Sequence, residues 1–223
     1  MRIARRLARS ITGQETFHHT DIRCPTLRLG SENAGFAVNP KLLGPTSVIY
    51  SFGIGTDISF DLELSKRFSA DIYAFDPTPR SLAWIATQSV PPEIHVHPYG
   101  LAHFDGSLTF HAPENPSHVS YSMVDRKGEC VTCPVYRLTT LMNKFGHDHL
   151  DLLKIDIEGC EYDVISDFLA SHIPIRQFCV EFHHRLPGIG SRKTDLAIEA
   201  LRAAGYRIFH ISALGEEFSF IQT

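Results

Sequence analysis

Three carboxylates and a histidine of this sequence follow short apolar runs that have the character of buried strands. They are Asp76, Asp156, Glu181 and His183. Carboxylates accept hydrogen bonds and bind cations, and an imidazole exchanges its proton near neutral pH. The carboxyl ends of parallel strands meet at one edge of a sheet, where such folds bind their ligands. The sequence therefore predicts one polar site assembled from residues that are far apart in the chain.

A glycine-containing turn is the second chemical feature. The sequence VIYSFGIGTD, residues 48–57, places Gly53 and Gly55 between an apolar run and a helical pattern. Glycine allows positive φ and has no Cβ, so backbone N–H groups at a helix N-terminus can approach a ligand. Asp76 follows at roughly the twenty-residue interval that presents a carboxylate to ribose hydroxyls in doubly wound folds, although a helix-capping role is the alternative. We therefore expect a nucleoside-type cofactor here.

Alternating strand and helix patterns position these residues. Predicted strands cover residues 48–52, 72–75, 94–99, 131–136, 150–155 and 175–182, and predicted helices cover residues 58–68, 80–88, 138–145, 161–169 and 194–204. The alternation implies an α/β fold with a mostly parallel sheet, right-handed crossovers and helices on both faces. The final sequences YRIFHIS and EEFSFIQ predict a C-terminal antiparallel hairpin.

Two segments depart from this alternation. Residues 1–46 have no sustained period and several Gly and Pro turn signals, so we expect an N-terminal cap or lid, with a short helix and a hairpin, ahead of a domain at residues 47–223. Residues 100–123 contain Asp105-Gly106 between two apolar runs, which predicts a small β-hairpin insertion and then a loop over the site.

The composition limits the class of protein. A chain of 223 residues with 43% hydrophobic and 21% charged residues suits one globular core. The net charge of −4 argues against nucleic acid as a partner, because backbone binding relies on clustered Lys and Arg. A basic N-terminal stretch, MRIARRLARS, allows weak contact with a membrane surface, but a solvated helix is the simpler interpretation. Five unevenly spaced cysteines and the lack of a long apolar run favour a cytoplasmic protein.

Together, the motifs resemble a known family. VIYSFGIGTD, IYAFDPTPRS, PYGLAHFDGSLTF, LLKIDIEGCEYDVI and FCVEFHH are similar to the FkbM-type methyltransferases, which are class I enzymes that use S-adenosylmethionine. The similarity runs from about Val48 to the C-terminus, and KIDIEGCE, residues 154–161, is its most specific part. The resemblance implies the class I methyltransferase (Rossmann-like) fold, whose last strand is reversed, whereas a nicotinamide-binding fold would carry GxGxxG.

The glycine turn departs from the family pattern at two positions. The family has an acid where this chain has Ser51, and a glycine where this chain has Asp57. The acid is expected to contact the methionine ammonium group of the cofactor. Asp57 is our candidate for supplying that carboxylate from the other side of the turn.

The resemblance implies O-methylation of a hydroxyl on a sugar or natural-product small molecule. It places the methionine part of S-adenosylmethionine at the glycine turn, the ribose at Asp76 and the adenine near the backbone of Leu101. The predicted cofactor-binding residues are Ser51, Gly53, Gly55, Asp57, Asp76, Leu101 and Asp156.

Activation of the hydroxyl is assigned to the polar residues at the later strand ends. His183 is the predicted base, with Asp156 and Glu181 orienting it or the acceptor. His183 and His184 are adjacent on a strand end, so only one of them can face the site. Asp156, Glu181 and His183 are equally a plausible ligand set for a divalent ion, and both routes stay open at this point.

Two other functions compete with this interpretation. A nicotinamide-dependent oxidoreductase would use a similar sheet, and a non-catalytic methyltransferase-like binding protein would keep the sheet without the chemistry. Ser51 and Asp57 favour the binding protein, whereas the acidic residues at the later strand ends favour an enzyme.

Overall fold

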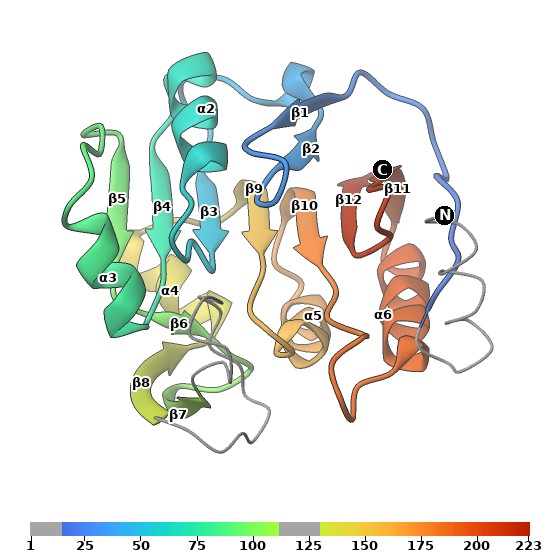
Figure 1. The fold of residues 1–223 in the computed structure, drawn as a ribbon. Coiled ribbons are helices and arrows are strands. Elements are labelled where there is room, and N and C mark those ends of the chain that lie inside the picture. Colours follow the sequence, from blue (N-terminus) through green and yellow to red (C-terminus); the bar gives the residue numbers. More distant parts are fainter. Residues whose placement is uncertain (1–14, 112–129) are drawn as a thin grey trace.

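A computed structural model describes residues 15–111 and 130–223 of the protein. Its central sheet contains β3 (Ile49–Phe52), β4 (Ile72–Phe75), β5 (Ile94–His97), β9 (Leu150–Ile155), β10 (Ile175–Glu181), β11 (Tyr206–Ile211) and β12 (Glu217–Gln222). The strand order is β11-β12-β10-β9-β3-β4-β5 (Figure 1). β12 is antiparallel to both of its neighbours and the remaining pairs are parallel, which confirms the predicted fold and its C-terminal hairpin.

In the described residues, five α-helices cover the two faces of the sheet. They are α2 (Ser59–Phe68), α3 (Pro79–Ile85), α4 (Leu138–Phe145), α5 (Glu161–Ala170) and α6 (Ser191–Ala203). One buried apolar cluster joins α4, α5 and α6 to the sheet, and a second joins α2 and α3 to the opposite face (Figure 1). The α/β alternation predicted from periodicity therefore produces three layers.

Strand side chains alternate between these two layers. On β3, Tyr50 and Phe52 enter the cluster with α4 and α5, whereas Ile49 enters the cluster with α2. The Phe52 ring stacks on Phe75 of the neighbouring strand, with ring centroids 4.3 Å apart. The same alternation turns Ser51 toward the α2 layer, away from these stacked rings.

The strand order reverses beside β3. The chain goes from β3 to β4 and β5 on one side, and returns to β9 and β10 on the other. In open parallel sheets, the crevice beyond such a reversal is the usual ligand site. The loops after β3, β4 and β9 therefore border the expected site.

The N-terminal part contains the predicted hairpin. β1 (Leu27–Leu29) pairs antiparallel with β2 (Phe36–Val38), and a 3-10 helix, η1 (Pro40–Leu42), follows. The hairpin packs on the α2 side of the sheet, since Leu29, Phe36 and Val38 belong to that apolar cluster. The basic stretch of residues 1–10 lies outside the described residues.

The predicted small β insertion is present, but its strands pair differently from the prediction. β6 (Gly100–Leu101) and β7 (Gly106–His111) do not pair with each other, because β8 (Cys130–Tyr136) lies between them. A tight primed turn requires positive φ at its central residues, and Gly106 is not among the described positive-φ glycines. Asp105 instead accepts hydrogen bonds from Arg137 N at 2.8 Å and from Thr140 Oγ1 at 2.8 Å. The loop expected over the site falls on residues 112–129, outside the described residues.

Within the described ranges, no helix combines the length and apolar character needed to cross a bilayer. All five cysteines are free thiols.

Candidate functional site

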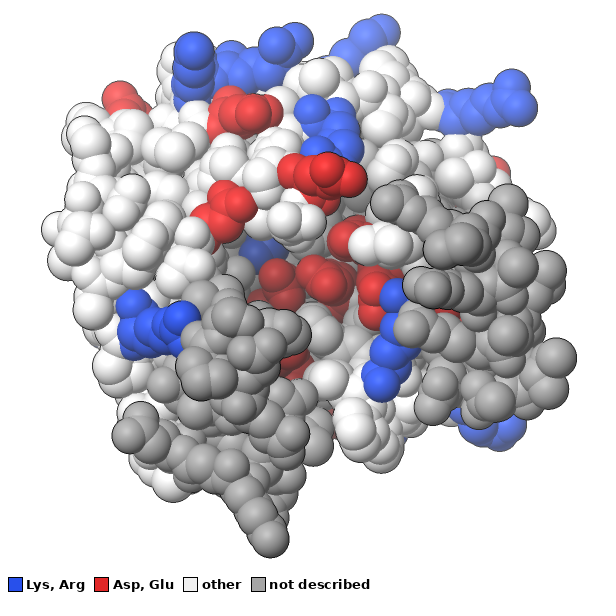
Figure 2. Space-filling view, in the orientation of Figure 1, with Lys and Arg blue, Asp and Glu red and all other residues white. Residues whose placement is uncertain are grey.

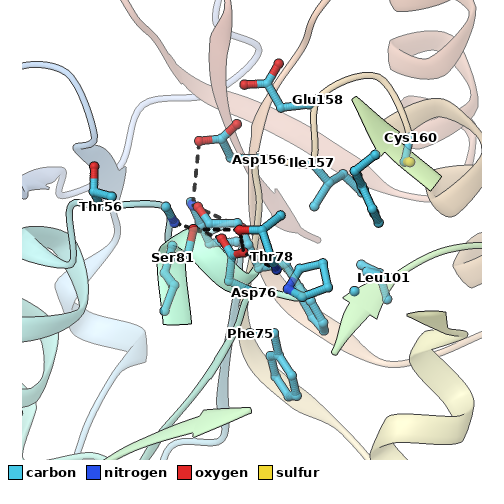
Figure 3. Close-up of a pocket in the computed structure, with 18 of the residues that line it drawn as sticks. Thr56, Phe75, Asp76, Thr78, Ser81, Leu101, Asp156, Ile157, Glu158 and Cys160 are labelled. Carbon is cyan, nitrogen blue, oxygen red and sulfur yellow. Dashed lines mark hydrogen bonds and ion pairs between the residues drawn. The ribbon is translucent and has the colours of Figure 1, made fainter. Parts of the chain in front are cut away.

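A cavity of about 290 Å³ lies at the carboxyl ends of β3, β4 and β9. Acidic side chains gather in a hollow on this face of the molecule (Figure 2). Asp156 and Glu158 lie at one end of the lining and Phe75 at the other (Figure 3). Of the residues predicted to bind a cofactor, the cavity lining includes Gly53, Gly55, Asp57, Asp76, Leu101 and Asp156.

The glycine turn after β3 requires both of its glycines for different reasons. Gly53 has φ +77°, and a Cβ built on it would lie 1.7 Å from the backbone oxygen of Asp156. Gly55 has φ +52°, and a Cβ there would meet nothing within 4 Å. Gly53 thus lets two loops touch, whereas Gly55 supplies a backbone conformation that other residues rarely adopt.

Asp76 caps the entry to α3 and also lines the cavity, so it combines the helix-capping and ligand-binding positions considered from the sequence. Its Oδ2 accepts from Gly55 N at 2.9 Å, and its Oδ1 accepts from Thr78 N at 2.9 Å and from Thr78 Oγ1 at 2.6 Å. It therefore holds the glycine turn and the entry to α3 while it lines the cavity. A carboxylate has about four acceptor positions, so one position remains on Oδ2 for a ligand hydroxyl.

Asp57 and Ser51, the two residues that depart from the family pattern, have different surroundings. Asp57 lines the cavity, but its Oδ1 accepts from Ser59 N at 2.8 Å and its Oδ2 accepts from Ser31 Oγ at 2.7 Å. It joins the start of α2 to the loop between β1 and β2. Ser51 is fully buried and lies outside the cavity lining. The alternation of β3 is the physical reason.

Lys154 is a site residue that the sequence analysis did not identify. It is buried on β9 opposite Ser51, lines the cavity, and donates to the backbone oxygens of Phe52 at 3.0 Å and Gly53 at 2.9 Å. Asp61 of α2 is buried as well. Burial raises the pKa of its carboxyl, and the charge of Lys154 offsets only part of this rise. A lysine within an apolar strand was the available signal, because a buried charge requires partners.

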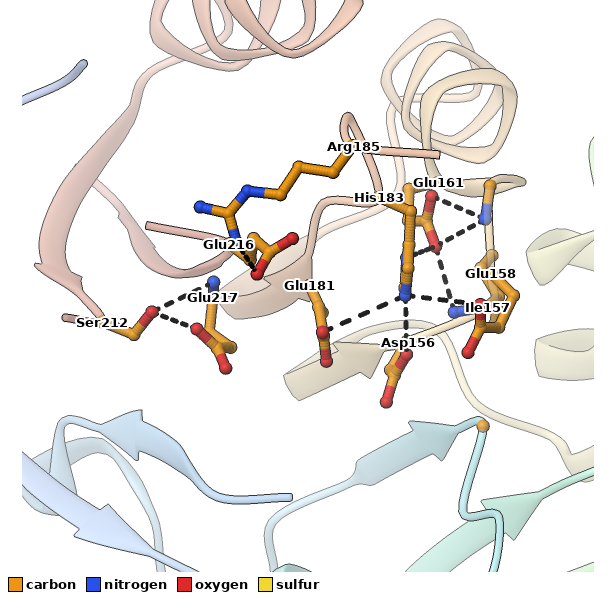
Figure 4. Close-up of polar contacts among 12 residues, drawn as sticks. Asp156, Ile157, Glu158, Glu161, Glu181, His183, Arg185, Ser212, Glu216 and Glu217 are labelled. Atoms are coloured by element: carbon orange, nitrogen blue, oxygen red, sulfur yellow. Dashed lines mark hydrogen bonds and ion pairs between the residues drawn. The ribbon is translucent and has the colours of Figure 1, made fainter. Parts of the chain in front are cut away.

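His183 lies at the centre of a carboxylate cluster beside the cavity (Figure 4). Its Nδ1 is 2.9 Å from Glu161 Oε1. Its Nε2 is 3.6 Å from Asp156 Oδ1, 3.7 Å from Glu158 Oε2 and 4.0 Å from Glu181 Oε1. The predicted residues Asp156, Glu181 and His183 are thus brought together, and Glu158 and Glu161 join them.

The cluster shifts the pKa of its members. Burial disfavours the charged imidazole, but Glu161, Asp156 and Glu158 outweigh burial and raise the pKa of His183 well above its usual value. Burial, followed by the charge of Asp156, raises the pKa of Glu181 to about 8. The raised pKa favours the protonated imidazole, which has to release a proton before Nε2 can act as a base or as a ligand.

Glu161 holds the cluster from the start of α5. Its side chain is fully buried, and Oε1 accepts from Ile157 N and Gly159 N at 3.1 Å each. Glu158 has the positive φ of +54°, which is uncommon for a residue other than glycine. The adjacent His184 is buried elsewhere, with Nε2 3.8 Å from Glu15 Oε1.

The family comparison matches most of the chain. The model of the Methyltransferase FkbM domain matches residues 47–208. The probable methyltransferase-like protein 24 of Rattus norvegicus is 24% identical over 173 residues, which are 73% of this chain and 42% of that protein. The protein of the same name from Homo sapiens is 22% identical over the same shares of both chains. The chain thus spans less than half the length of these curated relatives.

A solved structure shares the fold. The methyltransferase FkbM of Methylobacillus flagellatus KT superposes with a TM-score of 0.51 at 14% sequence identity. The match covers 80% of this chain and 44% of that chain.

Proposed function

The chain belongs to the FkbM methyltransferase domain family, and from this premise we propose that it transfers a methyl group from S-adenosylmethionine to a hydroxyl oxygen of a small molecule. The acceptor class that we propose is a sugar or a natural product. One observation carries the proposal: a single cavity connects the glycine turn and Asp76 to Asp156 and Glu158, which contact His183.

The cavity lining fits the charge of this cofactor. Among the described residues, the lining contains the carboxylates Asp57, Asp76, Asp156 and Glu158 and one basic side chain, Lys154. S-adenosylmethionine carries an ammonium group, a carboxylate and an activated methyl on a positive sulfonium. An acidic lining favours such a cation, and low-dielectric walls strengthen the attraction.

Each part of the lining has a proposed role toward the cofactor. Gly53, Gly55 and Asp57 would hold the methionine part, and the free acceptor position of Asp76 would take a ribose hydroxyl. The backbone near Leu101 would border the adenine. Lys154 would act indirectly, because its bonds to Phe52 and Gly53 fix the turn.

The remaining chemistry consists of positioning and proton removal. A new bond forms between the acceptor oxygen and the methyl carbon while the carbon–sulfur bond breaks, and the hydroxyl proton must leave. We propose that the acceptor oxygen lies beside His183 Nε2, with Asp156 and Glu181 orienting it. The proton can pass to the imidazole, or it can leave after the oxygen binds a cation held by the same residues.

Binding of S-adenosylhomocysteine tests the cofactor assignment. We expect it to raise the melting temperature and to bind with one site per chain in calorimetry, while NAD and NADP have no effect. Stabilisation by a nicotinamide nucleotide alone would establish the oxidoreductase alternative.

Turnover separates an enzyme from a binding protein. With labelled S-adenosylmethionine and a panel of hydroxylated small molecules, we expect methyl transfer that His183→Ala removes. Cofactor binding without transfer to any acceptor would favour the binding protein, and unchanged turnover in His183→Ala would exclude His183 from the chemistry.

Two further assignments belong to this proposal. Residues 1–46 would form a cap on the domain at residues 47–223, because Asn33 and Ala34 line the cavity and Ser31 contacts Asp57. A cytoplasmic location fits the five free cysteines, since the cytosol keeps thiols reduced.

A further inference from the structure

We propose that Asp156, Glu158 and His183 bind a divalent metal ion beside the acceptor end of the cavity. Each of these residues offers one ligand atom, and the three atoms lie within 4.8 Å of one another. The inference deepens the proposed function, because the ion would lie where the acceptor hydroxyl has to lose its proton.

The distances in the cluster suit coordination better than hydrogen bonding. Nε2 of His183 lies 3.6 Å from Asp156 Oδ1 and 3.7 Å from Glu158 Oε2, and both separations exceed hydrogen-bond length. Ligand atoms that each lie about 2.0–2.2 Å from one ion are separated by roughly 3–4 Å from each other. The distances from Nε2 to the Asp156 and Glu158 oxygens are therefore those of neighbouring ligands of one ion.

The imidazole is oriented in the way that metal-binding histidines are oriented. Nδ1 of His183 faces the buried carboxylate of Glu161 at 2.9 Å, which directs Nε2 toward Asp156 and Glu158. Metal-ligating histidines commonly donate their other N–H to a carboxylate, which fixes the tautomer and the ring orientation. Glu161 is held in turn by Ile157 N and Gly159 N. This backing separates the cluster from a simple patch of acidic residues.

The local charge favours a cation. Asp156, Glu158, Glu161 and Glu181 surround one imidazole, and Nζ of Lys154 lies 3.8 Å from Asp156 Oδ2. Partly buried carboxylates that face one another are unfavourable unless they are paired. A divalent ion offsets two of these charges at the position where three carboxylates converge on Nε2.

The position of the cluster gives the ion a chemical role. Asp156 and Glu158 also line the cavity, so an ion bound to them faces the proposed cofactor site. Three protein ligands leave coordination positions for an acceptor oxygen, and coordination lowers the pKa of a hydroxyl. The hydroxyl proton is released to water, the oxygen forms the bond to the methyl carbon, and the carbon–sulfur bond breaks. The products are a methyl ether and S-adenosylhomocysteine.

Manganese is a suitable probe for this site. One imidazole nitrogen and two carboxylate oxygens form a set that suits Mg²⁺ or Mn²⁺ more than the soft metals that thiolates select. We would titrate the protein with Mn²⁺ and follow the loss of the free-ion signal by electron paramagnetic resonance, without cofactor or acceptor. The expected result is one saturable site per chain.

Variants decide whether the named residues form the site. Glu161→Gln removes only an outer-shell partner, so it should weaken Mn²⁺ binding by roughly 10- to 100-fold. A larger loss is expected from each of the ligand variants, which are Asp156→Asn, Glu158→Gln and His183→Gln. Glu217→Gln is the matched control, because Glu217 pairs with Glu181 across β10 and β12 but supplies none of the three ligands. It should keep nearly the affinity of the unaltered protein.

Several outcomes would overturn the inference. One is that the unaltered protein shows no saturable Mn²⁺ binding. Another is that Glu217→Gln and Glu158→Gln weaken Mn²⁺ binding equally. The third is that the ligand variants bind Mn²⁺ with the affinity of the unaltered protein. Circular dichroism and melting curves identify variants that do not fold, and Glu158→Gln then decides, because 20% of the Glu158 side chain is exposed.

The same protein samples separate this inference from the proposed function. If S-adenosylhomocysteine binds and Mn²⁺ does not, the metal site is wrong and the proposed function stands. If Mn²⁺ binds and S-adenosylhomocysteine does not, the proposed function fails independently. Methyl transfer that survives exhaustive chelation would also contradict the metal route.

Discussion

Lys154 illustrates at the scale of single residues why a charge is tolerated inside a buried strand. Its Nζ donates to two backbone oxygens, and Asp61 of α2 supplies a buried carboxylate that acts on it electrostatically. Position 51, where the family has an acid, faces the same layer from the neighbouring strand. The carboxyl group that the family has at position 51 is thus found on α2 instead, where burial raises its pKa.

Replacing Lys154 with methionine tests this interpretation. Lys154→Met leaves two turn carbonyls without their donor and Asp156 Oδ2 without the ammonium group 3.8 Å away, so we expect a loss of about 3 kcal/mol of unfolding free energy, as for a broken buried pair. Binding of S-adenosylhomocysteine should weaken as well, because the glycine turn loses its support. Urea unfolding and calorimetry measure the two effects. The exposed Lys66→Met is the control, and equal stability of the two variants would show that Lys154 is not a supporting residue.

The two glycines of the turn form a matched pair of substitutions. Gly53→Ala adds a Cβ that would lie 1.7 Å from Asp156 O, whereas Gly55→Ala adds one in open space. Gly55→Ala should cost about 1–2 kcal/mol, the penalty of the left-handed conformation. Gly53→Ala should cost clearly more and should also weaken cofactor binding, because the loops after β3 and β9 have to separate. Urea unfolding compares them, and equal losses would contradict the assigned contact.

At the same scale, the sequence indicated only part of the carboxylate cluster around His183. His183, Asp156 and Glu181 were recognisable because they follow apolar strands. Glu161 was not, because an acidic residue in the first turn of a helix is favourable without any partner. Its contact with His183 depends on how α5 meets the end of β10, which a linear pattern does not contain.

At the scale of elements, periodicity predicted the regular parts well. The bounds of β4, β9 and α4 agree with the predicted ranges, since each has a clear apolar pattern and a definite end. The small antiparallel insertion was predicted, but its strand pairing was wrong because that pairing is not local. β7 pairs with β8, and the segment between them is longer than a hairpin turn.

His184, in the junction between β10 and α6, should make the stability of the fold depend on pH. Burial, aided by the charge of Arg185, lowers the pKa of His184 to about 4. The unfolded chain binds this proton near pH 6.5, so the stability from neutral His184 is complete above about pH 6.5 and falls as the pH drops toward 4. We expect about 2 kcal/mol less unfolding free energy at pH 5 than at pH 7.5 from this group.

A variant isolates the contribution of His184 from that of the carboxylates. In urea unfolding at both pH values, His184→Gln should have a smaller pH dependence than the unaltered protein by about 2 kcal/mol. His149→Gln is the control, because His149 is exposed and has no such burial. The same pH dependence in all three proteins would show that His184 does not contribute it.

At the scale of the whole molecule, the site is a consequence of topology. β3 lies between the two halves of the sheet, so the loops after β3, β4, β9 and β10 meet at one edge although they are distant in sequence. That convergence was predictable from the alternation of strands and helices. The N-terminal segment was expected to be a cap or lid, but its contact with the glycine turn was not predictable, because its turns carry no periodic signal.

The contact between the N-terminal hairpin and the glycine turn allows a test of the cap. Ser31 Oγ donates to Asp57 Oδ2 at 2.7 Å and accepts from Ala34 N at 3.0 Å, so one hydroxyl connects the cavity loop of the hairpin to the turn. Ser31→Ala should cost about 1 kcal/mol of stability. It should also weaken S-adenosylhomocysteine binding by roughly fivefold, because the lost hydrogen bond orders two walls of the cavity.

Thr26→Ala is the matched control on the same segment. The Thr26 hydroxyl donates to Cys24 O at 3.0 Å in an exposed turn and has no part in the cavity lining. If residues 1–46 only cover the sheet, both variants will keep full cofactor affinity and differ in stability alone. Calorimetry at one temperature and salt concentration measures the affinity of both variants. If only Ser31→Ala loses affinity, the hairpin forms a wall of the cofactor site. The cap and the domain at residues 47–223 would then form one binding unit.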